Sequence, residues 1–338
     1  GSGKTKTLTY RAARLIEDGV NPKNILLLTF TKKAAKEMLS RAALILDSRC
    51  EQITGGTFHS FANIILRKYS PLLELQNNFT ITDRTDSEDI INHIRSNIIN
   101  KQEKRFPKKG TILDIYSKAV NKNIPSDEII AAEYNNFSHC TEKINEIIRL
   151  YNEYKHKNSI LDYDDLLLYL RTLLESNPEV RKKLSNEYKY IMVDEYQDTN
   201  TIQAQIIKLL AAEHNNVMAV GDDSQSIYSF RGANFKNILE FPNIFENTEI
   251  IKLEQNYRSS QNILALANEI LLKAKEKYDK NLFSEIISPE KPALISAEDM
   301  QTEAKFIAQK VLELSVEENI PLHDICVLER VGRKRIYC

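Results

Sequence analysis

The chain has 338 residues, of which 42% are hydrophobic and 28% charged, a composition typical of folded globular proteins rather than disordered or fibrous ones. Its formal net charge of −1 excludes a general electrostatic attraction to nucleic acid, so only local charge could favour such a partner. Apolar runs are far shorter than a membrane span, and the four cysteines lack zinc-binding spacing. We therefore expect an intracellular, cytoplasmic protein with no membrane partner, no disulfide framework and no metal cluster of its own.

The first seventy residues alternate between helical and strand-like patterns. Residues 5–18 have the apolar spacing of a helix, and residues 24–30 form a short apolar run that is typical of a buried strand. Thr31 is placed to cap a second helix, and residues 53–58 predict another strand, followed by a helix to about Tyr69. This alternation predicts a parallel sheet covered by helices.

Residues 83–165 are polar, rich in Asn, Lys and Glu, and helical in period, which predicts a helical insertion. Strand patterns resume afterwards at residues 190–193, 216–220 and 249–253. The sheet is therefore expected to continue on the far side of the insertion.

The last part of the chain repeats the alternating pattern. Residues 263–274 and 302–314 predict helices, and residues 293–296 and 325–328 predict short strands. We interpret this part as the beginning of a second α/β domain.

The chain begins with Gly1-Ser2-Gly3-Lys4-Thr5, which matches the second half of a phosphate-binding loop. Backbone N–H groups of such a loop bind phosphates together with a helix N-terminus. Lys4 would reach the β- and γ-phosphates, and the Thr5 hydroxyl would ligate Mg²⁺. A glycine-rich segment left by expression cloning is the alternative interpretation of these five residues.

The strand at residues 190–193 ends in two carboxylates, Asp194 and Glu195. Ligands of open α/β sheets bind at the carboxyl ends of strands, so Asp194 is placed to hold Mg²⁺ and Glu195 to orient or deprotonate a water molecule. The alternative is a strand that leaves the core through a solvated acidic turn.

Six segments resemble, in order, the motifs of superfamily 1 DNA helicases of the UvrD/Rep/PcrA type. The most specific are the DEYQDTN segment at residues 194–200 and the segment at residues 220–233. The other four lie at residues 29–38, 56–60, 161–166 and 253–259. The resemblance extends over almost the whole chain.

The resemblance implies an α/β fold: a RecA-like P-loop domain with a parallel sheet and an all-helical insertion, followed by the start of a second RecA-like domain. Residues 1–82 and 166–257 would form the first, discontinuous ATP-binding domain. Residues 83–165 would form the insertion, and residues 258–338 part of the second domain. The implied activity is ATP-dependent, with ATP and Mg²⁺ bound, and consists of 3′-to-5′ movement on single-stranded DNA and unwinding of duplex DNA.

The resemblance also assigns roles at the nucleotide. Gln225 and Arg258 would contact the γ-phosphate, and Tyr257 would stack on the adenine. Arg231 would serve either the nucleotide or the DNA. The alternative for Tyr257 and Arg258 is an ordinary corner between a strand and a helix.

For DNA, the resemblance implies aromatic platforms at Phe30, Tyr228 and Phe230, on which the bases of single-stranded DNA stack. Thr57 and His59 match positions that contact the strand. The alternatives are a core position for Phe30 and a capping or core role for His59.

Local charge is consistent with a DNA partner. Residues 1–74 contain 12 Lys and Arg against 6 Asp and Glu. A second basic cluster in the insertion could bind DNA phosphates, or could be a solvated loop; it consists of Lys101, Lys104, Arg105, Lys108 and Lys109.

The sequence also departs from the family pattern. Lys32 stands where the family has Asn, Ser224 where an acid is common, and Phe230 where some members have Trp. The first half of the phosphate loop would precede Gly1, and the fifth and sixth motifs are not found, so we expect this chain alone to hydrolyse ATP poorly. A helicase subunit of a nuclease-helicase recombination complex, or an inactive nucleotide- or DNA-binding fragment, are the alternative interpretations.

Overall fold

The computed structural model describes residues 1–99, 105–228 and 232–329. It divides into two compact units, Gly1–Ile287 and Ser288–Cys338, which we describe separately. The first unit contains the sheet and nearly all of the buried side chains.

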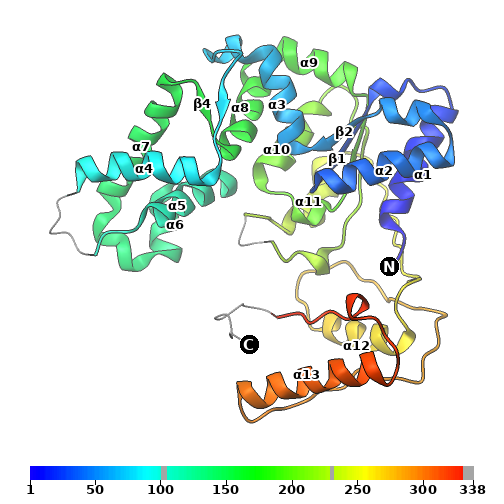
Figure 1. The fold of residues 1–338 in the computed structure, drawn as a ribbon. Helices are drawn as coiled ribbons and strands as arrows, with labels where there is room; N and C mark the ends of the chain where they lie inside the picture. The colour runs from blue at the N-terminus through cyan, green and yellow to red at the C-terminus, as the bar shows by residue number, and fades with distance from the viewer. Residues whose placement is uncertain (100–104, 229–231, 330–338) are drawn as a thin grey trace. The chain divides into compact units, whose positions relative to one another are not determined.

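The centre of the first unit is a four-stranded sheet in which every strand is parallel to its neighbour (Figure 1). Its strand order is β2-β1-β5-β6. The strands are β1 (Ile25–Thr29), β2 (Thr54–Thr57), β5 (Tyr190–Val193) and β6 (Val217–Ala219). The predicted α/β class with a parallel sheet is therefore confirmed, and three of the predicted strands that precede residue 200 lie within one residue of their expected bounds.

Alternate residues of the strands face opposite sides of the sheet, as the pleat requires. Leu26 and Leu28 of β1 pack into one hydrophobic cluster, whereas Ile25 and Leu27 pack into another. Both clusters are covered by helices, which explains why all five residues of β1 are buried and the first four are apolar.

One face is covered by α1 (Lys4–Glu17) and α2 (Lys32–Ile45), and the other by five helices. These are α3 (Phe58–Tyr69), α8 (Tyr163–Ser176), α9 (Pro178–Glu187), α10 (Thr201–Leu210) and α11 (Lys236–Ile244). Thr31 caps α2 as predicted, because its hydroxyl accepts a hydrogen bond of 3.1 Å from the backbone N–H of Ala34. Within the described residues, no helix has the length and apolar character needed to cross a membrane.

Between β2 and β5 the chain contains a group of helices with a hydrophobic core of its own, at residues 84–157, which we call the helical segment. They are α4 (Arg84–Ile98), α5 (Lys109–Lys122), α6 (Ser126–Glu133) and α7 (Thr141–Lys157). The helical character predicted for this stretch is confirmed. Two short strands that were not predicted, β3 (Thr80–Ile81) just before α4 and β4 (Ile160–Leu161) just after α7, pair in parallel.

Three predicted strands, at residues 249–253, 293–296 and 325–328, are wrong, because the described structure forms no strand there. Ile251 is 73% exposed and Leu294 is 99% exposed. An apolar run forms a strand only where a neighbouring strand satisfies its backbone hydrogen bonds, and these runs have no such neighbour among the described residues. The predicted helices here are α12 (Gln261–Leu272) of the first unit and α13 (Met300–Val316) of the second.

Candidate functional site

The carboxyl ends of the parallel strands meet at one edge of the sheet, and the N-terminus of α1 lies at the same edge. The Thr5 hydroxyl donates a hydrogen bond of 3.4 Å to Oδ2 of Asp194, although the two residues are 189 positions apart. The sheet therefore brings together two of the predicted site segments, the loop before α1 and the carboxylates after β5.

The loop at residues 1–5 has the backbone expected of a phosphate-binding turn. Gly3, the residue before α1, has φ of 85°, a left-handed conformation that favours glycine. A side chain at Gly1 would come within 2.3 Å of the side chain of Asn256. The first backbone N–H of α1 with a helical acceptor is that of Thr7, which donates to the carbonyl of Gly3 at 2.9 Å, so the N–H groups of residues 4–6 lie at a helix N-terminus, where anions bind.

Asp194 is buried, with 6% of its surface exposed. Burial, and then the negative charge of Glu195, raise the pKa of Asp194 to about 6. Its Oδ1 atom has no hydrogen-bond partner among the residues that the structure describes. A buried carboxylate oxygen without a partner, beside a hydroxyl oxygen, fits a Mg²⁺ ion that takes its other oxygen ligands from phosphate and water. No group of three or more His, Cys, Asp or Glu side chains in the described ranges could hold a metal ion.

Glu195 directly follows Asp194 and has φ of 51°, a left-handed conformation that is uncommon outside glycine. The side chain of Gln197 donates a hydrogen bond of 2.8 Å to Oε2 of Glu195. Oε1 of Gln197 accepts one of 2.9 Å from the backbone N–H of Asp222, after β6. Gln197 therefore connects the ends of two strands, a role that the sequence analysis did not assign.

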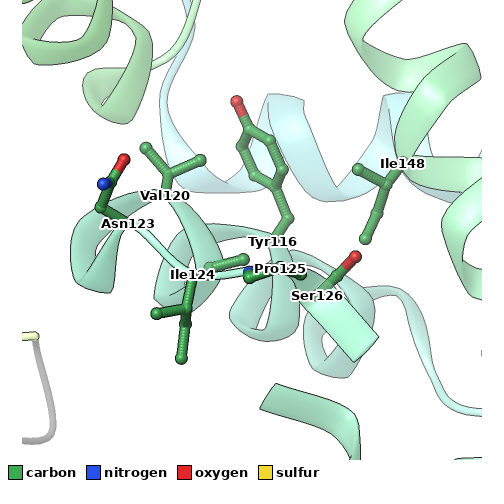
Figure 2. A pocket seen from close by; sticks show the side chains of 8 residues that line it. Tyr116, Val120, Asn123, Ile124, Pro125, Ser126 and Ile148 are labelled. Carbon is green, nitrogen blue, oxygen red and sulfur yellow. The ribbon is translucent and has the colours of Figure 1, made fainter. Parts of the chain in front are cut away.

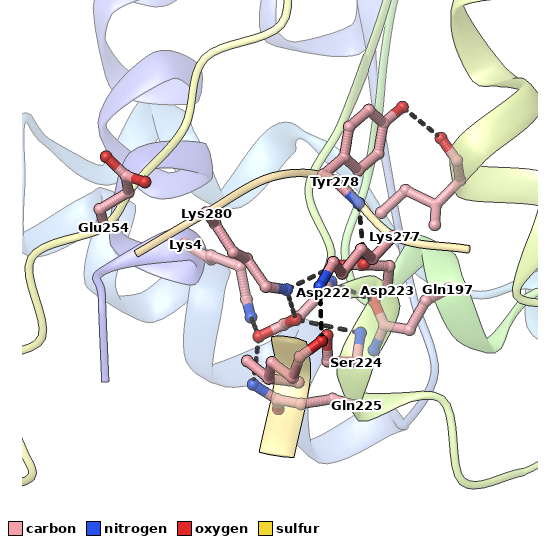
Figure 3. Close-up of polar contacts among 12 residues, drawn as sticks. Lys4, Gln197, Asp222, Asp223, Ser224, Gln225, Glu254, Lys277, Tyr278 and Lys280 are labelled. Carbon is pink, nitrogen blue, oxygen red and sulfur yellow. Dashed lines mark hydrogen bonds and ion pairs between the residues drawn. The ribbon is translucent and has the colours of Figure 1, made fainter. Parts of the chain in front are cut away.

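Asp222 lies at the centre of a group of charged and polar contacts (Figure 3). Gln225 donates a hydrogen bond of 2.6 Å to its Oδ2, and the Lys4 ammonium lies 3.4 Å from the same atom. Lys280 contacts Oδ1 of Asp222 and Oδ1 of Asp223, both at 2.5 Å. Burial raises the pKa of Asp222, but the hydrogen bond from Lys280 and the charges of Lys4 and Lys280 outweigh it and hold that pKa below its ordinary value.

Tyr257 and Arg258 lie on an exposed corner of the first unit. Oδ1 of Asn256 accepts hydrogen bonds from the backbone N–H groups of Arg258, at 2.8 Å, and Ser259, at 2.9 Å, which fixes the turn. The backbone N–H of Tyr257 donates to the carbonyl of Gly1 at 3.1 Å. The corner is thus joined to the candidate phosphate loop, and the Tyr257 ring remains 67% exposed.

Two of the three predicted aromatic platforms are described, and they stack on each other. The ring centroids of Phe30 and Tyr228 are 5.0 Å apart, with an angle of 30° between the ring planes. Phe30 is 38% exposed, so it is not a core residue. Phe230 and Arg231 lie outside the described residues.

The predicted strand contacts Thr57 and His59 lie at the start of α3. Thr57 caps this helix, because its hydroxyl accepts a hydrogen bond of 3.2 Å from the backbone N–H of Ser60. His59 packs edge-on against Tyr163, with ring centroids 5.9 Å apart. Burial lowers the pKa of His59 to about 4, so the imidazole is neutral at physiological pH. Tyr163, half exposed beside it, is an aromatic group that the sequence analysis did not single out.

The predicted basic cluster of the helical segment is divided. Arg105 and Lys108 are exposed, but Lys109 donates a hydrogen bond of 2.6 Å to Asp89. Lys101 and Lys104 lie outside the described residues. A solvated surface accounts for the described part of this cluster as well as a DNA contact does.

The helical segment also contains a pocket of about 330 Å³, far in sequence from the loop and the strand ends (Figure 2). Its lining consists of Tyr116, Ala119, Val120, Asn123, Ile124, Pro125, Ser126 and Ile148. Tyr116 is the one titratable residue among them, and its hydroxyl donates to Asp165, at 3.1 Å. This lining contains no His, Cys, Asp, Glu, Lys or Arg side chain, whereas motif residues meet at the edge of the sheet, which is therefore the candidate site.

Comparison with known proteins matches the chain to the family of helicases that its motifs resemble. The UvrD/REP helicase N-terminal domain family matches residues 1–246, and the UvrD-like helicase C-terminal domain family matches residues 251–337. ATP-dependent DNA helicase PcrA of Staphylococcus aureus is 36% identical over 314 residues, which cover 93% of this chain and 42% of that protein. DNA helicase II of Rickettsia typhi is 38% identical over 338 residues, which cover 98% of this chain and 50% of that protein. The chain spans half or less of the length of these relatives, and it belongs to the UvrD/REP helicase family.

Proposed function

We propose that this protein is an ATP-dependent DNA helicase that couples ATP hydrolysis to 3′-to-5′ movement on single-stranded DNA and to unwinding of duplex DNA. The observation that carries the proposal is the hydrogen bond between Thr5 and Asp194, whose buried Oδ1 atom finds no partner within the described part of the chain. Membership of the UvrD/REP helicase family supports it.

Each side chain at the edge of the sheet then has a chemical role. Thr5 and Asp194 would supply the protein ligands of a Mg²⁺ ion, which would neutralise phosphate charge when bound. Glu195 orients the attacking water and accepts its proton, and the hydrogen bond from Gln197 fixes the direction of its carboxylate.

The remaining nucleotide contacts come from the loop and the strand ends. Backbone N–H groups at residues 1–5 and the Lys4 ammonium bind the phosphates. Gln225 and Arg258 contact the γ-phosphate, and the exposed ring of Tyr257 stacks on the adenine. The nucleotide would then lie between the loop at residues 1–5 and the corner at Tyr257, whose backbone N–H donates to the carbonyl of Gly1.

We further propose that the parallel sheet is a RecA-like domain formed by residues 1–82 and 166–257, with an insertion at residues 83–165 and a second domain from residue 258. The separate hydrophobic core of the helical segment supports this division. Phe30 directly follows β1, and Tyr228, which stacks on it, lies in the loop that follows β6. In this proposal the carboxyl ends of the strands therefore bind both ATP and DNA. Base stacking tolerates any sequence, which suits a translocating enzyme.

The test is Glu195→Gln in the full-length protein. We expect DNA-stimulated ATP hydrolysis to fall by roughly 100-fold or more, while the affinity for a fluorescent ATP analogue stays within about threefold of the parent value, because the substitution removes a base and keeps the shape. Glu246→Gln, at an exposed carboxylate, is the control and should leave both values unchanged. Undiminished hydrolysis in Glu195→Gln would reject the proposal.

A further inference from the structure

Lys280 lies in a segment that neither the motifs nor the proposed catalytic roles explain. Its side chain is 15% exposed, and its ammonium contacts Asp222 and Asp223, both at 2.5 Å (Figure 3). Asp223 is more deeply buried still, at 4% exposure. An ion pair removed from water to this degree requires that each charge keep its partner, because a lone buried charge is costly.

The backbone around Lys280 is fixed on both sides. The backbone N–H of Tyr278 donates to Oδ2 of Asp223 at 3.1 Å, and the Tyr278 hydroxyl donates to the carbonyl of Ile238 on α11 at 2.9 Å. On the other side, Phe283 exchanges backbone hydrogen bonds with residues 254–256, at 3.2 and 2.7 Å. Lys280 therefore lies on a tether between the end of β6 and the turn that precedes Tyr257.

Asp222 has more donors than one carboxylate needs. Its Oδ2 faces both Lys4, at 3.4 Å, and Gln225, at 2.6 Å. Its Oδ1 faces Lys280 and the backbone N–H of Ser224, at 3.2 Å. If Lys4 moves away, both oxygens still have a hydrogen-bond donor, and the negative charge of Asp222 still has a cation beside it.

We propose that Lys280 is a positioning residue of the nucleotide site: by neutralising Asp222 and Asp223, it frees Lys4 to leave Asp222 and bind nucleotide phosphates. The inference rests on the proposed function, in which Lys4 is a phosphate ligand. Two lysines balance two carboxylates here. Without Lys280, Lys4 is the cation left beside Asp222 among the described residues and is held away from the phosphates, which themselves meet uncompensated negative charge.

The test compares Lys280→Gln with the parent in the full-length protein, using titration with a fluorescent, non-hydrolysable ATP analogue. We expect Lys280→Gln to weaken binding by roughly 10- to 100-fold, as expected for one uncompensated charge a few ångströms from the phosphates. Lys277→Gln is the matched control. Lys277 is three residues earlier and donates to the backbone carbonyl of Leu271 at 2.7 Å rather than to Asp222, so its variant should bind like the parent.

A second substitution separates neutralisation from the other roles that Lys280 could have. If Lys280 acts by neutralising Asp222, the double variant Lys280→Gln/Asp222→Asn should recover most of the lost affinity, because the charge that retains Lys4 is gone. No recovery would mean that Lys280 binds phosphate directly, and would overturn the proposal. Lys280→Gln with a lowered Tm and unchanged affinity would also overturn it, since Lys280 would then be structural.

Lys4→Ala distinguishes failure of this inference from failure of the proposed function. Loss of nucleotide binding in Lys4→Ala, together with parent-like binding in Lys280→Gln, would reject only the role of Lys280. Parent-like binding in Lys4→Ala would reject the proposed nucleotide site itself.

Discussion

The side chain of Asn200, at the end of the DEYQDTN segment, donates a hydrogen bond of 2.6 Å to Oδ1 of Asn121, on α5 of the helical segment. Asn121 in turn donates to Oδ1 of Asp164 at 2.7 Å, and burial is the main cause that raises the pKa of Asp164 to about 6. The helical segment is thus joined to the loop after β5 by a chain of buried amide contacts.

We expect Asn121→Ala to lower the free energy of unfolding by about 1–3 kcal/mol, because it leaves the side-chain N–H of Asn200 without its acceptor and removes one hydrogen-bond donor from the carboxylate of Asp164. Chemical denaturation at pH 7.5 measures this change. Asn158→Ala, at an exposed asparagine directly after the helical segment, should change it by no more than about 0.5 kcal/mol. Equal effects of the two variants would mean that the contact with Asn200 contributes nothing.

The raised pKa of Asp194 predicts a pH dependence with a definite sign. Because the folded-state pKa is about 6 and the ordinary value is 3.8, the ionised carboxylate costs stability above pH 6, and this cost disappears as the pH falls towards 4. We expect Asp194→Asn to stabilise the nucleotide-free protein at pH 7.5 by up to roughly 3 kcal/mol and to lose that advantage near pH 4. Thermal unfolding between pH 4 and 8 measures it.

The same carboxylate predicts how Mg²⁺-dependent nucleotide binding responds to acid. Protons compete with the metal for Asp194, so the contribution of Mg²⁺ to nucleotide affinity should decline as the pH falls through about 6. Titrations with and without Mg²⁺ at each pH isolate this contribution. An Mg²⁺ effect that stays constant from pH 8 to 5 would count against Asp194 as a ligand.

The stacked pair of Phe30 and Tyr228 predicts a loss of DNA affinity. Phe30→Ala should weaken binding of single-stranded oligonucleotides by roughly 1–3 kcal/mol, whatever their sequence, because a stacking surface is lost. Fluorescence anisotropy with two oligonucleotides of different composition measures it. Tyr10→Ala, at an exposed aromatic residue of α1, is the control. A loss confined to one base composition would argue against a general platform.

A buried ion-pair network joins Lys155 of α7 to two carboxylates at the start of α8, and it predicts a large effect on the free energy of unfolding. The ammonium of Lys155 is 3% exposed and lies 2.7 Å from Asp162 and 2.7 Å from Asp165. Lys155→Met should destabilise the protein by about 3–5 kcal/mol, because it leaves buried carboxylates without their cation. Arg149→Met breaks an exposed pair with Glu153 and should cost about 1 kcal/mol or less. Urea titrations of both variants and the parent measure these changes.

The sequence predicts the first half of the fold well because local patterns and tertiary structure agree there. The first four residues of the strand at 25–29 are apolar because both faces of the strand are covered, and Thr31 follows it at a capping position. The failures, such as the expected strand at residues 249–253, occur where an apolar run has no neighbouring strand. Periodicity reports which side chains are apolar, but not whether a hydrogen-bonding partner is present.

The candidate site divides in a similar way. Lys4, Thr5, Asp194 and Glu195 are recognisable because motif spacing fixes their chemistry along the chain. Lys280 is not, because its role depends on a contact with Asp222 across 58 residues, and nothing in its neighbourhood of the sequence signals a charge partner. Resemblance identifies residues within motifs, whereas the contacts that support them from elsewhere become visible only in three dimensions.

The pairing of β3 with β4 holds the two ends of the helical segment side by side, since Ile81 is opposite Leu161. β1 and β5 pair across that same long excursion of the chain. Closing so long a loop is entropically costly before its contacts form, and a helical segment that folds early around its own core shortens the distance that the strands must search. We therefore expect the helices at residues 84–157 to gain protection from hydrogen exchange earlier during refolding than the strand at residues 190–193. Because β3 and β4 hold the two ends of the helical segment next to each other, we expect that another segment with adjacent ends could replace it and leave the four-stranded sheet intact.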